Sequence, residues 1–256
     1  MSIYIQLTIL LLAYMTSWFI VSLIKKRNDV ADIAWGLGFI VLSWTSFFIS
    51  GEETMRGLIA CILITIWGTR LAWHIYLRNR NKTEDYRYLQ WRKEWGNWFL
   101  VRSYFQVYIL QGIFLYLIVF PVLFINKNAT SGITLFDIFG ILVWITGFIF
   151  ESVGDSQLKE FIKNPLNKGK IMTSGLWKYS RHPNYFGEVT QWWGLYIMAL
   201  SILNGWTTIF GPLTITCLIL FVSGIPLLEK KYIGRKDFEE YKKKTSIFFP
   251  LPPKRI

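Results

Sequence analysis

The chain contains seven apolar segments, each close to the length of a helix that crosses a bilayer, and they constrain its fold more than any other feature. A transmembrane helix needs about 20 mostly apolar residues, and this sequence is 53% hydrophobic and 18% aromatic. The sequence therefore predicts an all-α membrane protein, a seven-transmembrane helix bundle that forms a single domain over residues 1–256. The expected spans cover about residues 2–24, 33–50, 55–77, 99–125, 133–153, 184–203 and 206–228.

Lysine and arginine residues are concentrated in alternate loops between these segments. Basic loops tend to stay in the cytoplasm, so the pattern predicts an N-terminus outside and a cytoplasmic C-terminus. The expected location is a bacterial cytoplasmic membrane, or the endoplasmic reticulum in a eukaryote. The formal charge of +12 at pH 7 is then a property of the cytoplasmic face, where it either attracts anionic lipids or lines a pocket for a polyanionic ligand.

Arg70, His74 and Arg78 help to separate these two interpretations. Their i, i+4, i+8 spacing places three basic or titratable groups on one face of the third expected span. Attraction to lipid does not require a cation as far inside an apolar segment as Arg70, whose side chain cannot easily reach the interface. This stripe therefore favours a pocket.

The segment Gly175–Gly194 carries polar groups directly into an apolar helix. Pro183 suits the first helical position, because proline has no N–H to lose there. Beyond it, Asn184, Glu188 and Gln191 lie on one helical face. A carboxylate and two amides at membrane depth are costly unless they face a protein interior or a wet cavity. The pattern indicates a binding site.

Glu151, Asp155 and Lys159 form a second polar stripe where the fifth expected span leaves the membrane. These residues either pair with one another along the helix or accept hydrogen bonds from ribose and amide groups of a ligand. All three stripes lie near one membrane face, so a shared cavity explains them together. In the tail, Arg235 and Tyr241 could close over such a cavity as a lid.

Other chemistries have little support in the sequence. Cys61 and Cys217 stand alone in apolar segments and His74 and His182 are the only histidines, so neither a disulfide framework nor a metal site is expected. The G-x-G-x-x-G and P-loop motifs are absent, so a Rossmann fold would not hold a nucleotide here. The expected partners are a lipophilic small molecule from the bilayer and membrane lipids, with no nucleic acid and no metal.

Three motifs resemble those of the bacterial branch of the steroid 5α-reductase-like family: GLWKYSRHPNYFGEVTQWWG at Gly175–Gly194, DVADIAWG at Asp29–Gly36 and EDYRY at Glu84–Tyr88. The resemblance extends from about Asp29 to Pro250, which is nearly the whole chain. Sterol C14-reductases and isoprenylcysteine carboxyl methyltransferases share a similar RHPxYxG core and an acidic, tyrosine-containing tail. The core alone therefore leaves the cofactor open.

The resemblance implies a seven-helix membrane bundle that reduces a carbon–carbon double bond with NADPH held at the cytoplasmic side. It places Asn184 and Glu188 at the nicotinamide and Asp155 near the adenosine ribose. Arg181 and His182 would meet the pyrophosphate, where a helix N-terminus offers unpaired N–H groups. The full set of cofactor-binding residues that it implies is Arg78, Arg87, Asp155, Lys159, Arg181, His182, Asn184, Tyr185, Glu188, Arg235 and Tyr241.

This reduction also requires a hydrogen-bond donor at the carbonyl oxygen where negative charge develops. In the steroid-reducing relatives, a Glu on the second span and a Tyr beside a His on the third span meet that oxygen. Here Asp32 and Tyr76 are the catalytic candidates, because Asp32 stands in place of the Glu and Tyr76 lies two positions after His74. Asp32 can donate a proton if an apolar site keeps it protonated. Its other interpretation is an N-cap of the second span.

The sequence thus predicts NADPH-dependent reduction of a carbon–carbon double bond in a lipophilic, steroid-like or isoprenoid enone, in a membrane-embedded cavity. One alternative is an S-adenosylmethionine-dependent methyltransferase of a membrane-embedded substrate. Another is a non-catalytic protein that binds lipid or sterol. NADPH carries several negative charges and needs basic neighbours, whereas S-adenosylmethionine does not. The basic residues of the third span and the following loop therefore favour the reductase.

Overall fold

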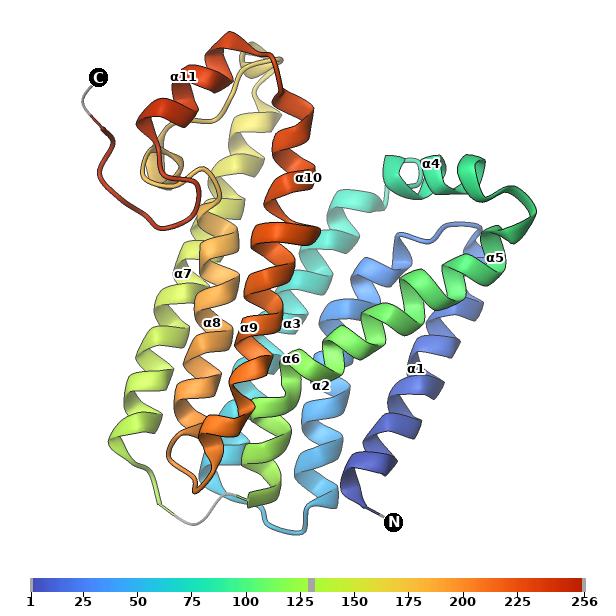
Figure 1. Cartoon of the computed structure of the whole chain (residues 1–256), viewed down its shortest axis with the longest axis vertical. Coiled ribbons are helices and arrows are strands. Elements are labelled where there is room, and N and C mark those ends of the chain that lie inside the picture. The colour runs from blue at the N-terminus through green and yellow to red at the C-terminus, as the bar shows by residue number, and fades with distance from the viewer. Residues whose placement is uncertain (1, 129–131, 255–256) are drawn as a thin grey trace. The chain divides into compact units, whose positions relative to one another are not determined.

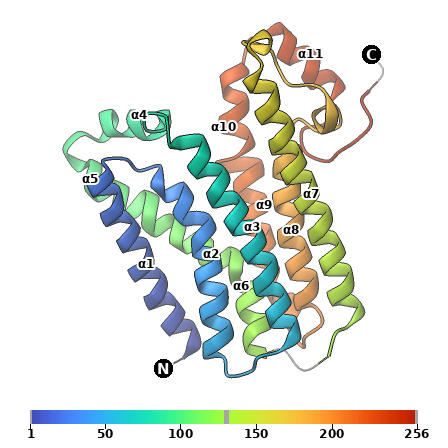
Figure 2. The same cartoon turned by 180° about the vertical axis from the view of Figure 1, so that it is seen from behind.

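The computed structural model describes residues 2–128 and 132–254, and the regular secondary structure of these residues is helical. Within the described residues, six helical segments are long and apolar enough to cross a membrane. The expectation of an all-α membrane protein is confirmed. The chain divides into two compact units, Met1–Thr134 with Ala199–Gly211 and Leu135–Met198 with Pro212–Ile256. Figures 1 and 2 trace the helices of both units from two sides.

The first unit contains three long helices followed by an interrupted fourth. Its elements are α1 (Ile3–Lys25), α2 (Val30–Ile49), α3 (Met55–Asn79), α4 (Tyr86–Trp95), α5 (Phe99–Arg102), the π-helix η2 (Ser103–Ile109), α6 (Leu110–Asn128) and η5 (Gly205–Ile209). Two glycines allow α2 and α3 to approach closely, since a Cβ atom on Gly36 would lie 2.8 Å from the carbonyl oxygen of Gly68. Small residues at such contacts are typical of membrane helices.

The second unit is built around two helices that lie side by side in both views, α7 and α8. Its elements are α7 (Leu135–Lys163), η4 (Gly175–Lys178), α8 (Pro183–Ala199), α9 (Phe210–Cys217), the π-helix η6 (Leu218–Val222), α10 (Ile225–Glu229) and α11 (Lys236–Lys244). The helix α7 continues to Lys163, well beyond the expected end of the fifth span. Glu151, Asp155 and Lys159 therefore lie on one continuous helix, as their spacing predicts.

Two expectations about the spans need correction. The segment expected to span the membrane at 184–203 is α8, which has 17 residues and ends at Ala199, so it is shorter than the six candidate spans. The second span begins at Val30 rather than at residue 33. Asp32 therefore lies in the first turn of α2, and Asp29 occupies the N-cap position. The interpretation of Asp32 as the N-cap is wrong.

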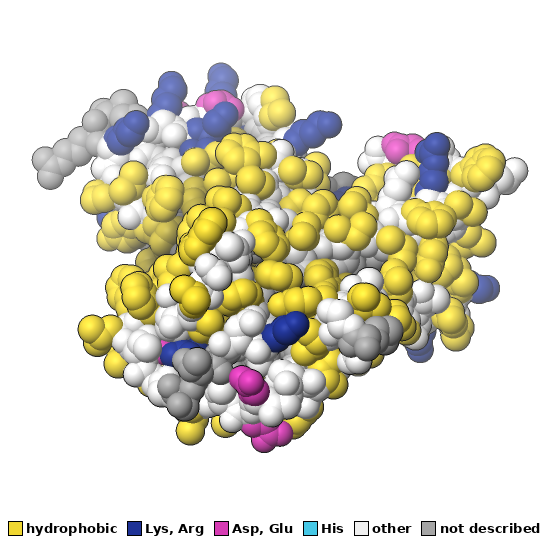
Figure 3. All heavy atoms as spheres, turned by 60° about the horizontal axis from the view of Figure 1, so that its bottom comes forward, with side chains coloured by type: hydrophobic (Ala, Val, Ile, Leu, Met, Phe, Trp, Pro, Cys, Tyr) yellow, Lys and Arg dark blue, Asp and Glu magenta, His cyan; other side chains and the backbone are white. Residues whose placement is uncertain are grey.

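Apolar side chains cover the outer surfaces of the long helices. In α1, Ile5, Ile9 and Ile20 are each about half exposed, and Leu142 and Ile149 are equally exposed on α7. Figure 3 shows hydrophobic side chains over much of the face that it displays. Such a surface is unfavourable in water but matches the acyl chains of a bilayer. This distribution agrees with an integral membrane protein.

Candidate functional site

The polar groups of the second unit are held by an unusually close contact between α7 and α8. A Cβ atom on Gly147 would lie 2.6 Å from the carbonyl oxygen of Gly187, and one on Gly187 would lie 2.5 Å from the carbonyl oxygen of Gly147. Any larger residue at either position would push the helices apart. Because the backbones touch here, side chains within one or two turns of this contact can bond across the interface.

Two carboxylate–amide pairs form across that interface. Gln191 Nε2 donates to Glu151 Oε2 at 2.5 Å, and Asn184 Nδ2 donates to Asp155 Oδ1 at 3.0 Å. Glu151 and Gln191 are buried, with 3% and 1% exposure, whereas the other pair is half-buried. The two stripes predicted from the sequence thus lie against each other. A carboxylate has two oxygens with several acceptor positions, so each can accept more hydrogen bonds than the one from its amide partner.

One buried atom of this cluster, Gln191 Oε1, lacks a partner among the described residues. Gln191 Oε1 is buried, and it accepts no hydrogen bond from the residues that the structure describes. A buried acceptor without a partner is costly, and it indicates a donor supplied from elsewhere. Glu188 and Tyr185, which the sequence also predicts to bind the cofactor, are half-buried on the same helix, and Lys159 is exposed on α7.

Arg181 and His182, expected at a pyrophosphate, both bind one carboxylate in this structure. Arg181 Nε donates to Glu229 Oε1 at 2.8 Å and Nη2 to Oε2 at 3.3 Å, while His182 Nε2 lies 3.0 Å from the same Oε1. Arg181 and His182 are both buried, with 8% and 6% exposure. Sequence analysis missed Glu229, although an acidic residue that ends an apolar run is a recognisable partner for a buried arginine.

The chain after α11 runs beside the segment that leads into α8. Arg181 N donates to the Ser246 carbonyl at 2.8 Å, and Ser180 Oγ donates to the Phe248 carbonyl at 2.7 Å. Tyr241 Oη donates to the carbonyl of Trp177. Burial raises the pKa of the Tyr241 hydroxyl above its usual range, so this group keeps its proton and remains a donor. These bonds fix the start of α8 from outside the helix.

Arg235, the other residue expected in a lid, lies at the N-cap position of α11. Its Nη2 binds Asp237 Oδ2 at 2.6 Å and the Gly169 carbonyl at 2.7 Å. Both partners belong to the protein surface, so in this structure Arg235 joins α11 to the loop that follows α7.

In the first unit, a second cluster surrounds Asp32. Tyr88 Oη donates to Asp32 Oδ1 at 3.1 Å, and Arg87 Nη2 lies 3.4 Å from Oδ2. Arg78 Nη2 lies 3.9 Å from the same oxygen. The structure therefore brings Asp32, Arg78 and Arg87 together. The sequence resemblance assigned Arg78 and Arg87 to the cofactor and Asp32 to catalysis, and it did not predict that these side chains contact one another. Tyr76 is 46% exposed on α3, so Tyr88, rather than Tyr76, is the tyrosine that binds Asp32.

The DVADIAWG and EDYRY motifs meet at this cluster. Glu84 Oε1 accepts from the backbone N–H of Asn28 at 2.6 Å. Asp85 caps α4 by accepting from Arg87 N at 3.0 Å, and it also accepts from Arg87 Nε at 3.0 Å. Burial alone would raise the pKa of Asp85, but the hydrogen bonds from Arg87 outweigh it and hold the pKa below its usual range. The ionised Asp85 orients Arg87 toward Asp32.

Comparisons with known proteins give partial matches. An uncharacterized protein of Schizosaccharomyces pombe is 27% identical over 226 residues, which cover 76% of this chain and 63% of that protein. Human 3-oxo-5-alpha-steroid 4-dehydrogenase 1 is 30% identical over 113 residues, 44% of this chain and 40% of the enzyme. A probable O-methyltransferase, ustE of Ustilaginoidea virens, is 46% identical over 46 residues, 18% of this chain and 16% of that protein.

The chain spans less than two thirds of the length of each of these relatives. No solved structure matches it significantly. One family match is nearly complete, since residues 18–245 match the family described as "Protein of unknown function (DUF1295)". The chain therefore belongs to the DUF1295 family.

Proposed function

We propose that this protein is an NADPH-dependent reductase of a carbon–carbon double bond in a lipophilic, steroid-like or isoprenoid enone. The observation that carries the proposal is the polar interface of α7 and α8, where two carboxylate–amide pairs join the two helices. The partial similarity to a steroid dehydrogenase supports the same activity. In this proposal α8 is a short seventh span, the N-terminus lies outside, and the cofactor binds at the cytoplasmic side.

The residues of this interface suit the groups that NADPH presents. Carboxylates such as Asp155 accept hydrogen bonds from ribose hydroxyls, and the amide of Asn184 can pair with a carboxamide. The buried acceptor Gln191 Oε1 offers a place for a further N–H or O–H donor. When bound, NADPH supplies a hydride to the double bond. The protein residues bind the cofactor, orient it and keep water away from it.

The cluster around Asp32 in the first unit contains hydrogen-bond donors of the kind that this reduction requires. A carbonyl oxygen gains negative charge as an enone is reduced, and a donor at that oxygen stabilises the charge. The Tyr88 hydroxyl carries a transferable proton and is held by Asp32 at 3.1 Å. Arg87 Nη2 lies 3.4 Å from Asp32 Oδ2 and helps to hold the carboxylate in place beside the Tyr88 hydroxyl.

The test is NADPH oxidation by the full-length protein in detergent, measured against a panel of steroid, sterol and isoprenoid enones. Asn184→Ala is expected to abolish turnover and weaken NADPH binding without loss of folded protein, because it removes one polar group from the interface. Asn81→Ala, at an exposed position, is the matched control. Wild-type affinity and rate in Asn184→Ala would refute this placement of the cofactor.

A methyltransferase is the second candidate, because a 46-residue segment matches a probable O-methyltransferase at 46% identity. The two candidates differ in charge at the cofactor, so calorimetric titration with NADPH and with S-adenosylmethionine separates them. Binding of S-adenosylmethionine alone would favour the methyltransferase. Binding of neither cofactor would favour a protein that only binds lipid.

A further inference from the structure

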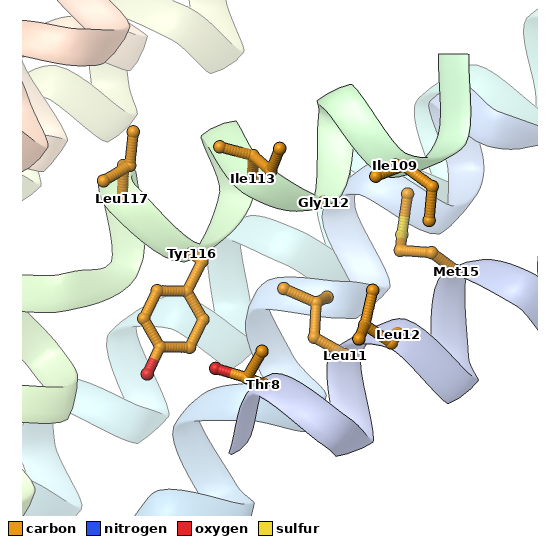
Figure 4. Close-up of a pocket in the computed structure, with 9 residues that line it drawn as sticks. All are labelled: Thr8, Leu11, Leu12, Met15, Ile109, Gly112, Ile113, Tyr116 and Leu117. Carbon is orange, nitrogen blue, oxygen red and sulfur yellow. The ribbon is translucent and has the colours of Figure 1, made fainter. Parts of the chain in front are cut away.

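A groove between α1 and α6 in the first unit is lined almost wholly by hydrocarbon. Its volume is about 200 Å³. Leu11 and Met15 form its floor at 6% and 1% exposure, whereas Leu12 and Ile113 form its rim at 47% and 52% exposure. Figure 4 shows these side chains arranged between the two helices. At Gly112 a Cβ atom would lie 3.1 Å from Met15, so the missing side chain helps to keep the groove open.

The two hydroxyl groups that line the groove are turned to the protein. Thr8 Oγ1 donates to the Tyr4 carbonyl at 2.8 Å, and Tyr116 Oη donates to the same carbonyl at 3.1 Å. Their protons are therefore used within the protein, and the groove offers mainly carbon surface to an occupant. Both helices belong to candidate membrane spans, so the occupant must be apolar along its length.

A cation lies at the Tyr4 end of this groove. Lys127, which is exposed, places its Nζ 4.8 Å from the centre of the Tyr4 ring, and the Tyr4 ring stacks on Phe120 with centroids 5.6 Å apart. The lysine and the aromatic pair thus lie about one helical turn beyond Thr8, the last residue of α1 that lines the groove at this end. An apolar groove that ends at a lysine matches an amphiphile with an anionic head.

The groove and the Tyr4 ring beyond it together match the thickness of one leaflet of a bilayer. The residues of α1 that line the groove run from Thr8 to Met15, a rise of about 10 Å, and Tyr4 lies about 6 Å further along the helix at about 1.5 Å per residue. Half of a hydrocarbon core is about 15 Å thick. We propose that the groove between α1 and α6 holds one acyl chain of a phospholipid whose phosphate lies at Lys127. This site does not depend on the proposed reductase activity.

The experiment uses the full-length protein in vesicles that contain phosphatidylglycerol with a photoreactive diazirine in one acyl chain. After irradiation, peptide mass spectrometry locates the adducts, which are expected on α1 and α6 around Leu12 and Ile113. Ile113→Trp fills the rim and is expected to lower this labelling about tenfold, the effect of roughly ten lost carbon–carbon contacts. Ile149→Trp, at a 53% exposed position on α7, is the matched control and should leave the labelling unchanged.

Leu12→Phe fills the groove from the opposite rim and must have the same effect, which keeps the test valid if Ile113→Trp does not fold. Labelling that is spread evenly over α1 and α7, or that falls equally in the control, would mean ordinary boundary lipid and overturn the proposal. Displacement of the label by an enone would assign the groove to a different occupant and overturn the proposal as well.

The phosphate is tested separately with Lys127→Gln. This change is expected to weaken labelling by the phosphatidylglycerol probe but not by a diacylglycerol probe with the same chains, because only the former carries a phosphate. Equal labelling of the variant and the wild type by phosphatidylglycerol would overturn the assignment of Lys127.

Discussion

Replacing Glu229 with glutamine is the sharpest test of how the start of α8 is held. The carboxylate of Glu229 accepts from Arg181 at 2.8 Å and lies 3.0 Å from His182 Nε2. Glutamine keeps the shape and one acceptor oxygen but removes the charge. Arg181 keeps its hydrogen bond to the Thr245 carbonyl at 2.8 Å, yet its own charge is left in a buried position without a counter-ion.

The size of the effect follows from the burial of the pair. Breaking a buried ion pair by removing one partner costs about 3–5 kcal/mol. The Arg181 and Glu229 side chains are 8% and 16% exposed, and glutamine still accepts one hydrogen bond, so the lower end, about 3 kcal/mol, applies. For a chain of this size, that loss corresponds to a melting temperature lower by roughly 6–12 °C.

Thermal melting in detergent, followed by circular dichroism, measures this loss. The matched control is Glu160→Gln, since Glu160 binds Lys163 at 2.7 Å on the surface of the same unit, with side chains 65% and 60% exposed. Exposed ion pairs contribute little, so the control should melt like the wild type. The double variant Arg181→Met with Glu229→Leu removes both charges and is expected to recover most of the loss. A Glu229→Gln variant that melts like the wild type would refute this reasoning.

Three further predictions follow from the same contacts. Arg78→Ala should weaken binding of NADPH more than binding of NADH, because only NADPH carries a 2′-phosphate; equal losses in a calorimetric titration would remove Arg78 from the cofactor site. Gly147→Val should lower the melting temperature markedly, because its Cβ would lie 2.6 Å from the Gly187 carbonyl, and an unchanged melting curve would contradict the close contact of α7 and α8. Tyr88→Phe removes the donor to Asp32 and should cost about 1 kcal/mol in unfolding experiments while it lowers the rate of NADPH oxidation, and a variant with an unchanged rate would exclude Tyr88 as the proton donor.

Six of the seven expected spans were predictable because length and hydropathy alone decide which of the described helices are candidate spans, and α8 is too short to be counted among them. The polar stripes were predictable too, since the spacing of Glu151 with Asp155 fixes one face of α7 whatever it packs against. What the stripes bind was not predictable. The partner of Glu151 is Gln191, 40 residues away, and only the contact between Gly147 and Gly187 sets which turns of the two helices meet.

The catalytic role of Tyr76 stays a prediction, but the side of α3 on which it lies follows from the sequence. Two residues along a helix correspond to a rotation of about 200°, so Tyr76 points away from the face that carries His74 and Arg78. By contrast, the pairing of Tyr88 with Asp32 joins residues 56 apart and depends on how the loop after α3 folds back. Arg181, just before α8, and Glu229, at the end of α10, are likewise 48 residues apart. Although Glu229 ends an apolar run, no local pattern in the sequence shows which cation it binds.

The polar interface of α7 and α8 can be explained either as a clamp between helices or as a ligand site, and the energies favour the second. Hydrogen bonds between membrane helices contribute about 0.6 kcal/mol on average and at most about 1.7. A pair that served only as a clamp would leave no buried acceptor unsatisfied, yet Gln191 Oε1 accepts no hydrogen bond from the residues that the structure describes. An unsatisfied buried acceptor costs about 1–3 kcal/mol, which is more than such a bond contributes on average. The polar pair is therefore better explained by a ligand that supplies the missing donor than by the stability of the helix pair.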